Sequence, residues 1–156
     1  MTIPRLLPVL PLALLLVTCG GSDQGGIRAT WTTFVRAECD KAHACRGSYS
    51  GTAAEFEYDY GASAAACASV VQGAEFDLVI GLYEAAEADG RLAHNAANAQ
   101  TCFSAMRAQS CADFWQGVDP SPACDVIFTG KIANGGTCTV PDECVSAACD
   151  DSMICV

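Results

Sequence analysis

This 156-residue sequence contains eleven cysteines, whose thiols could bind a metal, carry out redox chemistry or form disulfides. No two of them are spaced C-x-x-C, and the closest pair, Cys144 and Cys149, has four residues between. Thioredoxin-like redox sites and zinc knuckles use that short spacing, so we expect no cofactor, metal or redox role for these thiols. We expect structural disulfides instead, with the pairing left open, among the ten cysteines that follow residue 38: Cys39, Cys45, Cys67, Cys102, Cys111, Cys124, Cys138, Cys144, Cys149 and Cys155.

The two histidines lack the neighbours that catalysis needs. A catalytic triad requires a histidine oriented by a carboxylate beside a nucleophile. The stretch from Gly47 to Gly51 comes nearest to a nucleophile elbow, but it has Tyr49 where the serine belongs. We therefore expect His43 and His94 to be solvated surface residues, and we predict no catalytic residue.

Acidic side chains form three local groups. Asp142-Glu143 and Asp150-Asp151 flank cysteines near the C-terminus, and Glu55, Glu57 and Asp59 alternate with aromatic residues. A calcium site takes about six to eight oxygens, more than any of these groups offers alone. We expect the acids to solvate loops. The alternatives are a weak calcium site in the tail and a cation site or an aromatic carbohydrate platform at residues 55–60.

Apolar residues at three- and four-residue steps predict the helices that position these groups. Helices are expected at 27–46, at 64–72 with Ser63 as the N-cap, up to Gly90 as the residue after a C-cap, and from Asn95 onward. Residues 76–80 fit either an extended segment or a helix. The alternation at residues 55–60 predicts a strand or an extended loop with its aromatic side chains on one face.

The C-terminal segment differs in kind from the helical part. Its last four cysteines are spaced C-x5-C-x4-C-x5-C, with too little apolar bulk for a core. We predict a mainly α fold: a small disulfide-rich helical domain at 27–130, followed by a cysteine-stapled loop module of little regular structure at 131–156.

The N-terminus has the pattern of an export signal. Arg5 is its one charge, and the apolar run at 6–17 would rise only about 18 Å as a helix, against ~30 Å of hydrocarbon in a bilayer. The sequence ending in Thr18-Cys19-Gly20 resembles the bacterial lipobox, although Thr18 departs from the usual small residue. The resemblance implies a lipoprotein signal peptide at 1–18, lipidation of Cys19 and a flexible tether at 19–26. An ordinary secretory signal cleaved near Gly21 is the alternative.

The stretch from Cys124 to Cys138, followed by Asp142-Glu143-Cys144 and Ala148-Cys149-Asp150, carries a further resemblance. It resembles the cysteine-rich tail of uncharacterised lipoproteins from myxobacteria and related deltaproteobacteria. Those tails are similar to the N-terminal cysteine-rich region of dickkopf proteins. The resemblance implies an exported, lipid-anchored protein of the bacterial cell envelope and implies no catalytic residue. By resemblance to enterobacterial sorting, Gly20 after the cysteine favours the outer membrane, with a secreted protein as the alternative.

The charge balance limits the classes of partner that the protein can bind. Eighteen acidic against eight basic residues give a net charge of -10, which argues against nucleic acid. We expect a membrane contact through the lipid anchor and a non-enzymatic role in binding an envelope protein or a surface polymer. That role predicts an exposed aromatic patch, drawn from Trp31, Trp115 or Tyr58, although the place of Trp31 on a helical apolar stripe favours a core position for it. The alternative function, a hydrolase that uses carboxylates, predicts a pocket of converging acids.

Overall fold

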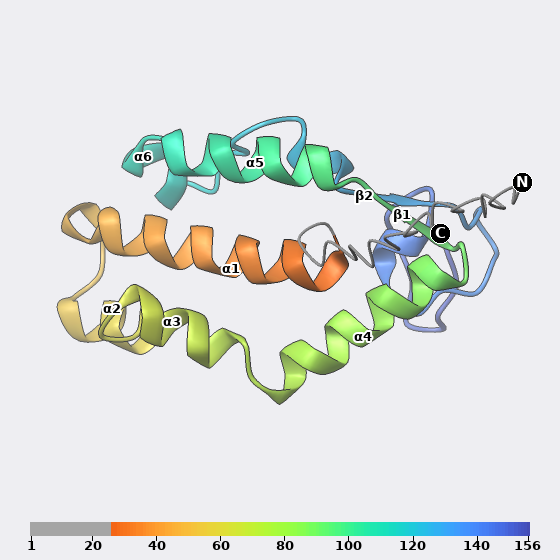
Figure 1. The fold of residues 1–156 in the computed structure, drawn as a ribbon, viewed down its shortest axis with the longest axis horizontal. Coiled ribbons are helices and arrows are strands. Elements are labelled where there is room, and N and C mark those ends of the chain that lie inside the picture. Colours follow the sequence, from red (N-terminus) through yellow and green to blue (C-terminus); the bar gives the residue numbers. More distant parts are fainter. Residues whose placement is uncertain (1–25) are drawn as a thin grey trace, which may run out of the picture.

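The structure, a computed structural model, describes residues 26–156. The predicted signal peptide, the lipidation site Cys19 and the tether up to residue 25 lie outside these residues. Helix α1 (Ile27–Ala44) runs through the middle of the helical part, as Figure 1 shows. Helix α5 (Ala96–Ala108) packs along one side, and α2 (Ala53–Tyr60), α3 (Ala64–Val71) and α4 (Ala74–Ala88) line the other. The predicted mainly α, disulfide-rich fold is confirmed.

Side-chain caps explain where several helices begin and end. Ser63 caps α3 and Asn95 caps α5, each by accepting a hydrogen bond from the backbone N–H three residues on. Gly90, at φ +71°, ends α4, and the N–H of Arg91 then donates to the carbonyl of Ala86. These three boundaries agree with those expected from the sequence.

The prediction of a strand or loop at residues 55–60 is wrong, because this segment is helix α2. Thr52 and Glu55 form a reciprocal capping box that starts the helix. Phe56 and Tyr60, one turn apart, then face the interior, while Tyr58 is 91% exposed. Residues 76–80, for which two structures were open, are helical and belong to α4.

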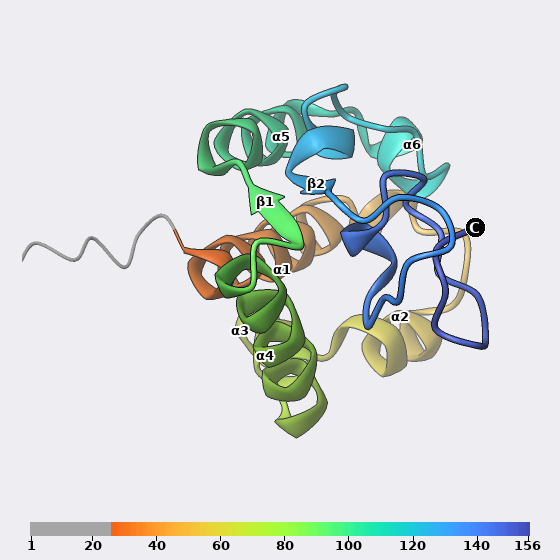
Figure 2. The same ribbon diagram turned by 90° about the vertical axis from the view of Figure 1, so that its right-hand side faces the viewer.

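A two-stranded sheet joins the helical part to the segment that follows it. Strand β1 (Leu92–His94) pairs antiparallel with β2 (Phe128–Gly130), with Leu92 opposite Gly130 and His94 opposite Phe128 (Figure 2). Four short helices complete the described secondary structure: η1 (Arg46–Ser48), α6 (Cys111–Trp115), η2 (Cys124–Val126) and η3 (Pro141–Glu143). The tail at 131–156 contains only η3 and isolated bridges.

Five disulfides use all ten cysteines of the described part. Three of them staple the helical part, and two interleaved ones close the tail; none of the five joins the tail to the helices. The pairs are Cys39–Cys67, Cys45–Cys111, Cys102–Cys124, Cys138–Cys149 and Cys144–Cys155. The sulfurs of Cys138, Cys144 and Cys155 lie within 4.8 Å of one another, but as disulfides they offer no thiolate to a metal.

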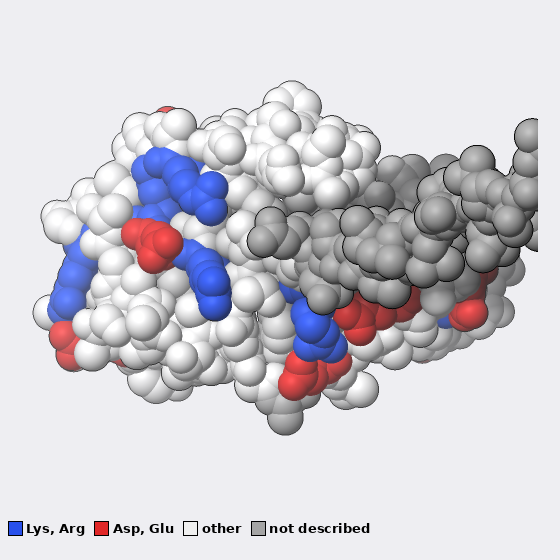
Figure 3. All heavy atoms as spheres, in the orientation of Figure 1, with Lys and Arg blue, Asp and Glu red and all other residues white. Residues whose placement is uncertain are grey.

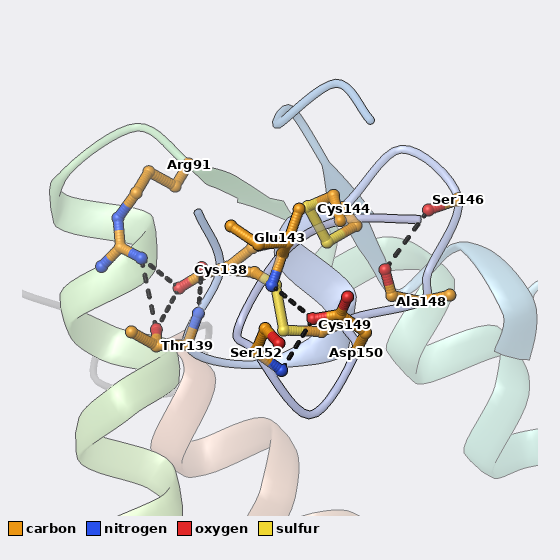
Figure 4. Close-up of a disulfide and its surroundings, with 12 residues drawn as sticks. Arg91, Cys138, Thr139, Glu143, Cys144, Ser146, Ala148, Cys149, Asp150 and Ser152 are labelled. Atoms are coloured by element: carbon orange, nitrogen blue, oxygen red, sulfur yellow. Dashed lines mark hydrogen bonds and ion pairs between the residues drawn. A yellow bond between two sulfur atoms is a disulfide. The ribbon is translucent and has the colours of Figure 1, made fainter. Parts of the chain in front are cut away.

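Several contacts hold the tail to the helices, among them one buried carboxylate, an apolar contact and a hydrogen bond from the hydroxyl of Tyr83 to Asp142. Glu143 is fully buried, accepts hydrogen bonds from the backbone N–H (2.8 Å) and the hydroxyl (2.6 Å) of Thr139, and forms an ion pair with Arg91 (Figure 4). Val140 joins a core cluster with Ile80 and Leu92. The expectation that Glu143 merely solvates a loop is therefore wrong: it neutralises a guanidinium at the joint between the two parts.

An exposed apolar face follows the bend between α3 and α4. It consists of Val70, Val71, Leu78, Val79 and Leu82. Within residues 26–156 no single helix is long and apolar enough to cross a membrane; by length and composition alone, α3 and α4 together pass that test as a pair bent by 63°.

Candidate functional site

An aromatic cluster fills the end of the molecule at which α1 finishes. Tyr49, Phe56, Tyr60 and Trp115 pack edge to face or tilted, with ring centroids 5.2–6.4 Å apart. The indole N–H of Trp115 donates to the carbonyl of Cys45 (3.1 Å) and so ties α6 to the end of α1. Trp115 is therefore packed and not the exposed patch that was expected. Two clefts flank the cluster.

The first, which we call the Tyr58 cleft, has a volume of about 580 Å³ and lies where η1 leads into α2. It is lined by Tyr49, Ser50, Gly51, Ala54, Glu55, Tyr58 and Asp59. Tyr58 stands out into solvent and is the one large aromatic side chain among residues 26–156 that is exposed. Of the three aromatic residues proposed for a surface patch, only Tyr58 has this position.

The polar groups of the Tyr58 cleft are held in place by local hydrogen bonds. The hydroxyl of Tyr49 donates to Oδ2 of Asp59 (2.8 Å), and this bond raises the pKa of Tyr49. Oε2 of Glu55 accepts from the backbone N–H of Thr52 (2.6 Å), which lowers the pKa of Glu55 and keeps it a carboxylate. The cleft thus combines the phenol of Tyr49 and two fixed carboxylates with the exposed phenol ring of Tyr58.

Gly51 gives this cleft its floor. A Cβ at this position would lie 2.6 Å from Cε1 of Tyr49 and 3.0 Å from Oε2 of Glu55. No other residue type therefore fits without moving the ring or the carboxylate.

The second, which we call the Glu38 cleft, has a volume of about 340 Å³ and lies between α1, α6 and the segment that follows α6. Phe34, Tyr60 and Trp115 contribute rings to its lining, and Glu38 and Asp119 contribute carboxyl groups. Burial raises the pKa of Glu38, because a desolvated carboxylate loses hydration. Tyr49, which lines the Tyr58 cleft, packs against Trp115, which lines this one, with ring centroids 5.2 Å apart, so the two clefts lie on either side of this ring pair.

The histidines are not the solvated side chains that were expected. Nε2 of His43 lies 3.0 Å from the carbonyl oxygen of Tyr60, and Nε2 of His94 lies 2.9 Å from Oγ1 of Thr30. Both rings are half-buried, and burial lowers the pKa of His94. Each histidine stabilises the packing of α1 against a neighbouring element.

The acidic pairs of the tail are occupied by the protein itself. Oδ1 of Asp150 accepts from the backbone N–H groups of Ser152 (2.8 Å) and Ile154 (3.0 Å), and Glu143 is buried as described above (Figure 4). Three of the four acids, Asp142, Glu143 and Asp150, are thus hydrogen-bonded within the protein, which weakens the alternative of a calcium site there.

Sequence reasoning missed Glu38, Tyr49 and Asp119 as members of a site. Glu38 lies on the predicted first helix next to the apolar Cys39, a neighbourhood that a helical projection could have revealed. Asp119 follows Gly117 and Val118 in a loop, and nothing in its local sequence indicates where it lies.

Three comparisons with known proteins found no match. No protein-family model matches it. None of the curated proteins matches it either. No solved structure matches it.

Proposed function

We propose that this protein is an exported, lipid-anchored protein of the bacterial cell envelope that binds a neutral surface polysaccharide without cleaving it. One observation carries the binding role: two clefts, each combining aromatic rings with carboxyl groups, lie on either side of the packed rings of Tyr49 and Trp115. Sugar rings stack their C–H faces on aromatic side chains, and their hydroxyls donate to carboxylates. An extended glycan fits such a pair of adjoining clefts better than a small molecule does.

The charge of the chain supports a neutral polymer over an anionic one. The sequence has ten more acidic than basic residues, and the Tyr58 cleft adds Glu55 and Asp59 without a basic lining residue. On the face shown in Figure 3, basic side chains lie in small groups beside acidic ones, with broad uncharged areas between. A polyanion would meet repulsion at the cleft, whereas a neutral glycan would not.

Export and anchoring are supported by two separate features. The ten cysteines of the described part are all in disulfides, which persist in oxidising compartments outside the cytoplasm. The sequence before residue 26 has the pattern of a lipoprotein signal that ends at Cys19. The tether would join α1 at Ile27, about 27 Å of helix from the end that carries the two clefts.

The anchor is tested by the intact mass of the membrane-extracted protein, before and after reduction and alkylation. A chain that begins at Cys19, carries acyl mass and has ten cysteines that label only after reduction is the expected result. An unacylated chain that begins near Gly21 would replace the anchor with simple secretion.

Polysaccharide binding is tested by affinity electrophoresis of the purified full-length protein through gels that contain neutral or acidic glycans. We expect retardation by a neutral glycan and a loss of about fivefold in affinity in Tyr58→Ala, because one stacking ring is removed. Val145→Ala, at a residue that is 69% exposed in the tail, is the matched control. Equal retardation of Tyr58→Ala and the control would exclude the Tyr58 cleft as the binding site.

A carboxylate hydrolase is the second candidate, favoured by Glu38 alone. Its raised pKa is the property required of a general acid, and Asp119 lines the same cleft. Release of new reducing ends from a neutral glycan by the wild type, abolished in Glu38→Gln, would establish hydrolysis in place of binding alone. Retardation without such release is expected from the proposed function.

A further inference from the structure

A third cavity lies between α1, α5 and the segment from η2 to β2, and Phe34 lines both this cavity and the Glu38 cleft. The volume of the third cavity is about 230 Å³. Trp31, Phe34, Phe103 and Phe128 supply aromatic walls, the Cys102–Cys124 disulfide closes one side, and Asp142 reaches it from the tail. Among its lining residues Asp142 is the one charged group, so the cavity combines four aromatic rings with a single carboxylate.

We propose that this cavity binds an alkylated ammonium group, of the quaternary or methylated class. Aromatic rings attract cations electrostatically, and a carboxylate beside them adds a full opposite charge. A metal ion or an unsubstituted ammonium would lose hydration that this apolar lining cannot replace. An alkylated ammonium is weakly hydrated and surrounds its charge with methyl groups, which suits aromatic walls.

The size of the cavity fits such a group. An apolar cavity of roughly 150 Å³ holds a benzene molecule. At about 230 Å³, this cavity has room for a trimethylammonium group with a short alkyl chain, but not for a ligand with two rings.

The walls and the carboxylate are fixed before any ligand arrives. Trp31 packs against Phe34, Tyr83 and Phe128 with centroids 5.6–6.0 Å apart, and its indole N–H is buried without a hydrogen-bond partner among the described residues. Packing alone therefore sets the ring. The hydroxyl of Tyr83 donates to Oδ2 of Asp142 (2.5 Å), which orients the carboxylate and leaves Oδ1 outside every hydrogen bond and ion pair found within residues 26–156. A preorganised site costs a ligand little reorganisation.

Choline and its uncharged isostere 3,3-dimethylbutan-1-ol provide the test, because they share a shape and differ in charge. The chain has two tryptophans, so the full-length protein with Trp115→Phe reports on Trp31 alone by fluorescence. We expect choline to change this emission with an affinity at least about tenfold higher than that of the alcohol. Asp142→Asn should remove this preference, and Asp125→Asn, at an exposed residue outside the lining, should keep it.

Each outcome decides the matter. Equal affinity for choline and the alcohol would show an apolar cavity with no selectivity for cations, and no response to either up to about 10 mM would show no site at all. A preference for choline that survives Asp142→Asn would also overturn the assignment.

Binding of free choline identifies a small solute as the ligand, whereas binding of a short-chain phosphatidylcholine alone identifies a lipid headgroup. Tyr58→Ala should leave choline binding unchanged. The ammonium site and the polysaccharide site can therefore be refuted independently of each other.

Discussion

Two carboxyl groups of this protein are shielded from water, one with hydrogen-bond donors around it and the other without. Glu143 is buried among donors, namely Arg91 and the N–H and hydroxyl of Thr139, whereas burial alone acts on Glu38. A buried carboxylate with partners stabilises the fold in its ionised form. One without partners favours the neutral acid. The two residues therefore respond differently to substitution.

Glu143→Gln should lower the free energy of unfolding by about 2 kcal/mol, because it removes the charge that Arg91 pairs with and weakens two hydrogen bonds. Urea unfolding of the oxidised protein measures this loss. Asp151→Asn, at an exposed acid of the same tail, should change it by less than about 0.5 kcal/mol. Equal effects of the two substitutions would contradict the role given to Glu143.

Glu38→Gln should change the pH dependence of stability. Because burial raises the pKa of Glu38 in the folded state, the folded protein holds this proton to higher pH than the unfolded chain does. The wild type therefore loses stability as the pH rises from the ordinary glutamate range, roughly 4.3, through the raised value. The glutamine variant lacks that loss, so the melting temperatures of the two proteins, measured from pH 3 to pH 7, should run parallel at the acid end and diverge as the pH rises above roughly 4.3. Curves that stay parallel over the whole range would show that Glu38 is solvated.

At the scale of elements, α2 shows that two local sequence patterns can predict different structures for one segment. The alternation of acids and aromatic residues at 55–60 suggested a strand, yet Thr52 and Glu55 form a capping box that fixes a helix start. Thr52→Ala should cost about 1 kcal/mol in stability and weaken glycan binding, because α2 carries Tyr58. Circular dichroism and urea unfolding check this. Thr101→Ala, whose hydroxyl bonds back to Ala97 on α5, is the control.

Two glycines should respond in opposite directions to alanine. A Cβ on Gly130 would collide with the backbone of Glu143 and Cys144, so Gly130→Ala should separate β2 from the tail and cost about 1–3 kcal/mol. Gly81 lies inside α4 with open space around it, so Gly81→Ala should add about 0.5–1 kcal/mol. Thermal unfolding of both variants measures the pair. Destabilisation by Gly81→Ala would mean that α4 is packed differently.

The elements also show what sequence reasoning reaches. Helix starts at Ser63 and Asn95 and the end at Gly90 were predictable, because each depends on one side chain or one backbone conformation nearby. Three features of the structure could not be predicted from the sequence: the burial of Glu143, the hydrogen-bond partner of Asp142, and the position of Glu38 and Asp119 in one cleft. Each depends on contacts between residues distant in sequence, which only tertiary packing brings together. The disulfide pairing was beyond reach for the same reason.

At the scale of the whole molecule, covalent and non-covalent connections are divided between the two parts. No disulfide of the described part links the tail to the helices, and the tail after Lys131 contains neither Lys nor Arg. Trypsin digestion of the denatured, unreduced protein should therefore release residues 132–156 as one free peptide, lighter than its reduced form by two hydrogens for each disulfide. Mass spectrometry decides the matter. Recovery of this peptide only after reduction would refute the pairing.

The Cys39–Cys67 disulfide has a mechanical consequence if the chain is anchored at one end and holds a polymer at the other. A load pulling between Gly26 and Tyr58 is carried along the backbone to Cys39, across the disulfide to Cys67, and back to the cleft. Even with every helix of this path unwound, the path is only about 22 residues long and becomes taut at a total length of roughly 75 Å. The residues of the Tyr58 cleft lie within the loop that this disulfide closes. The disulfide therefore limits the distance that can open under load between the Tyr58 cleft and the membrane anchor.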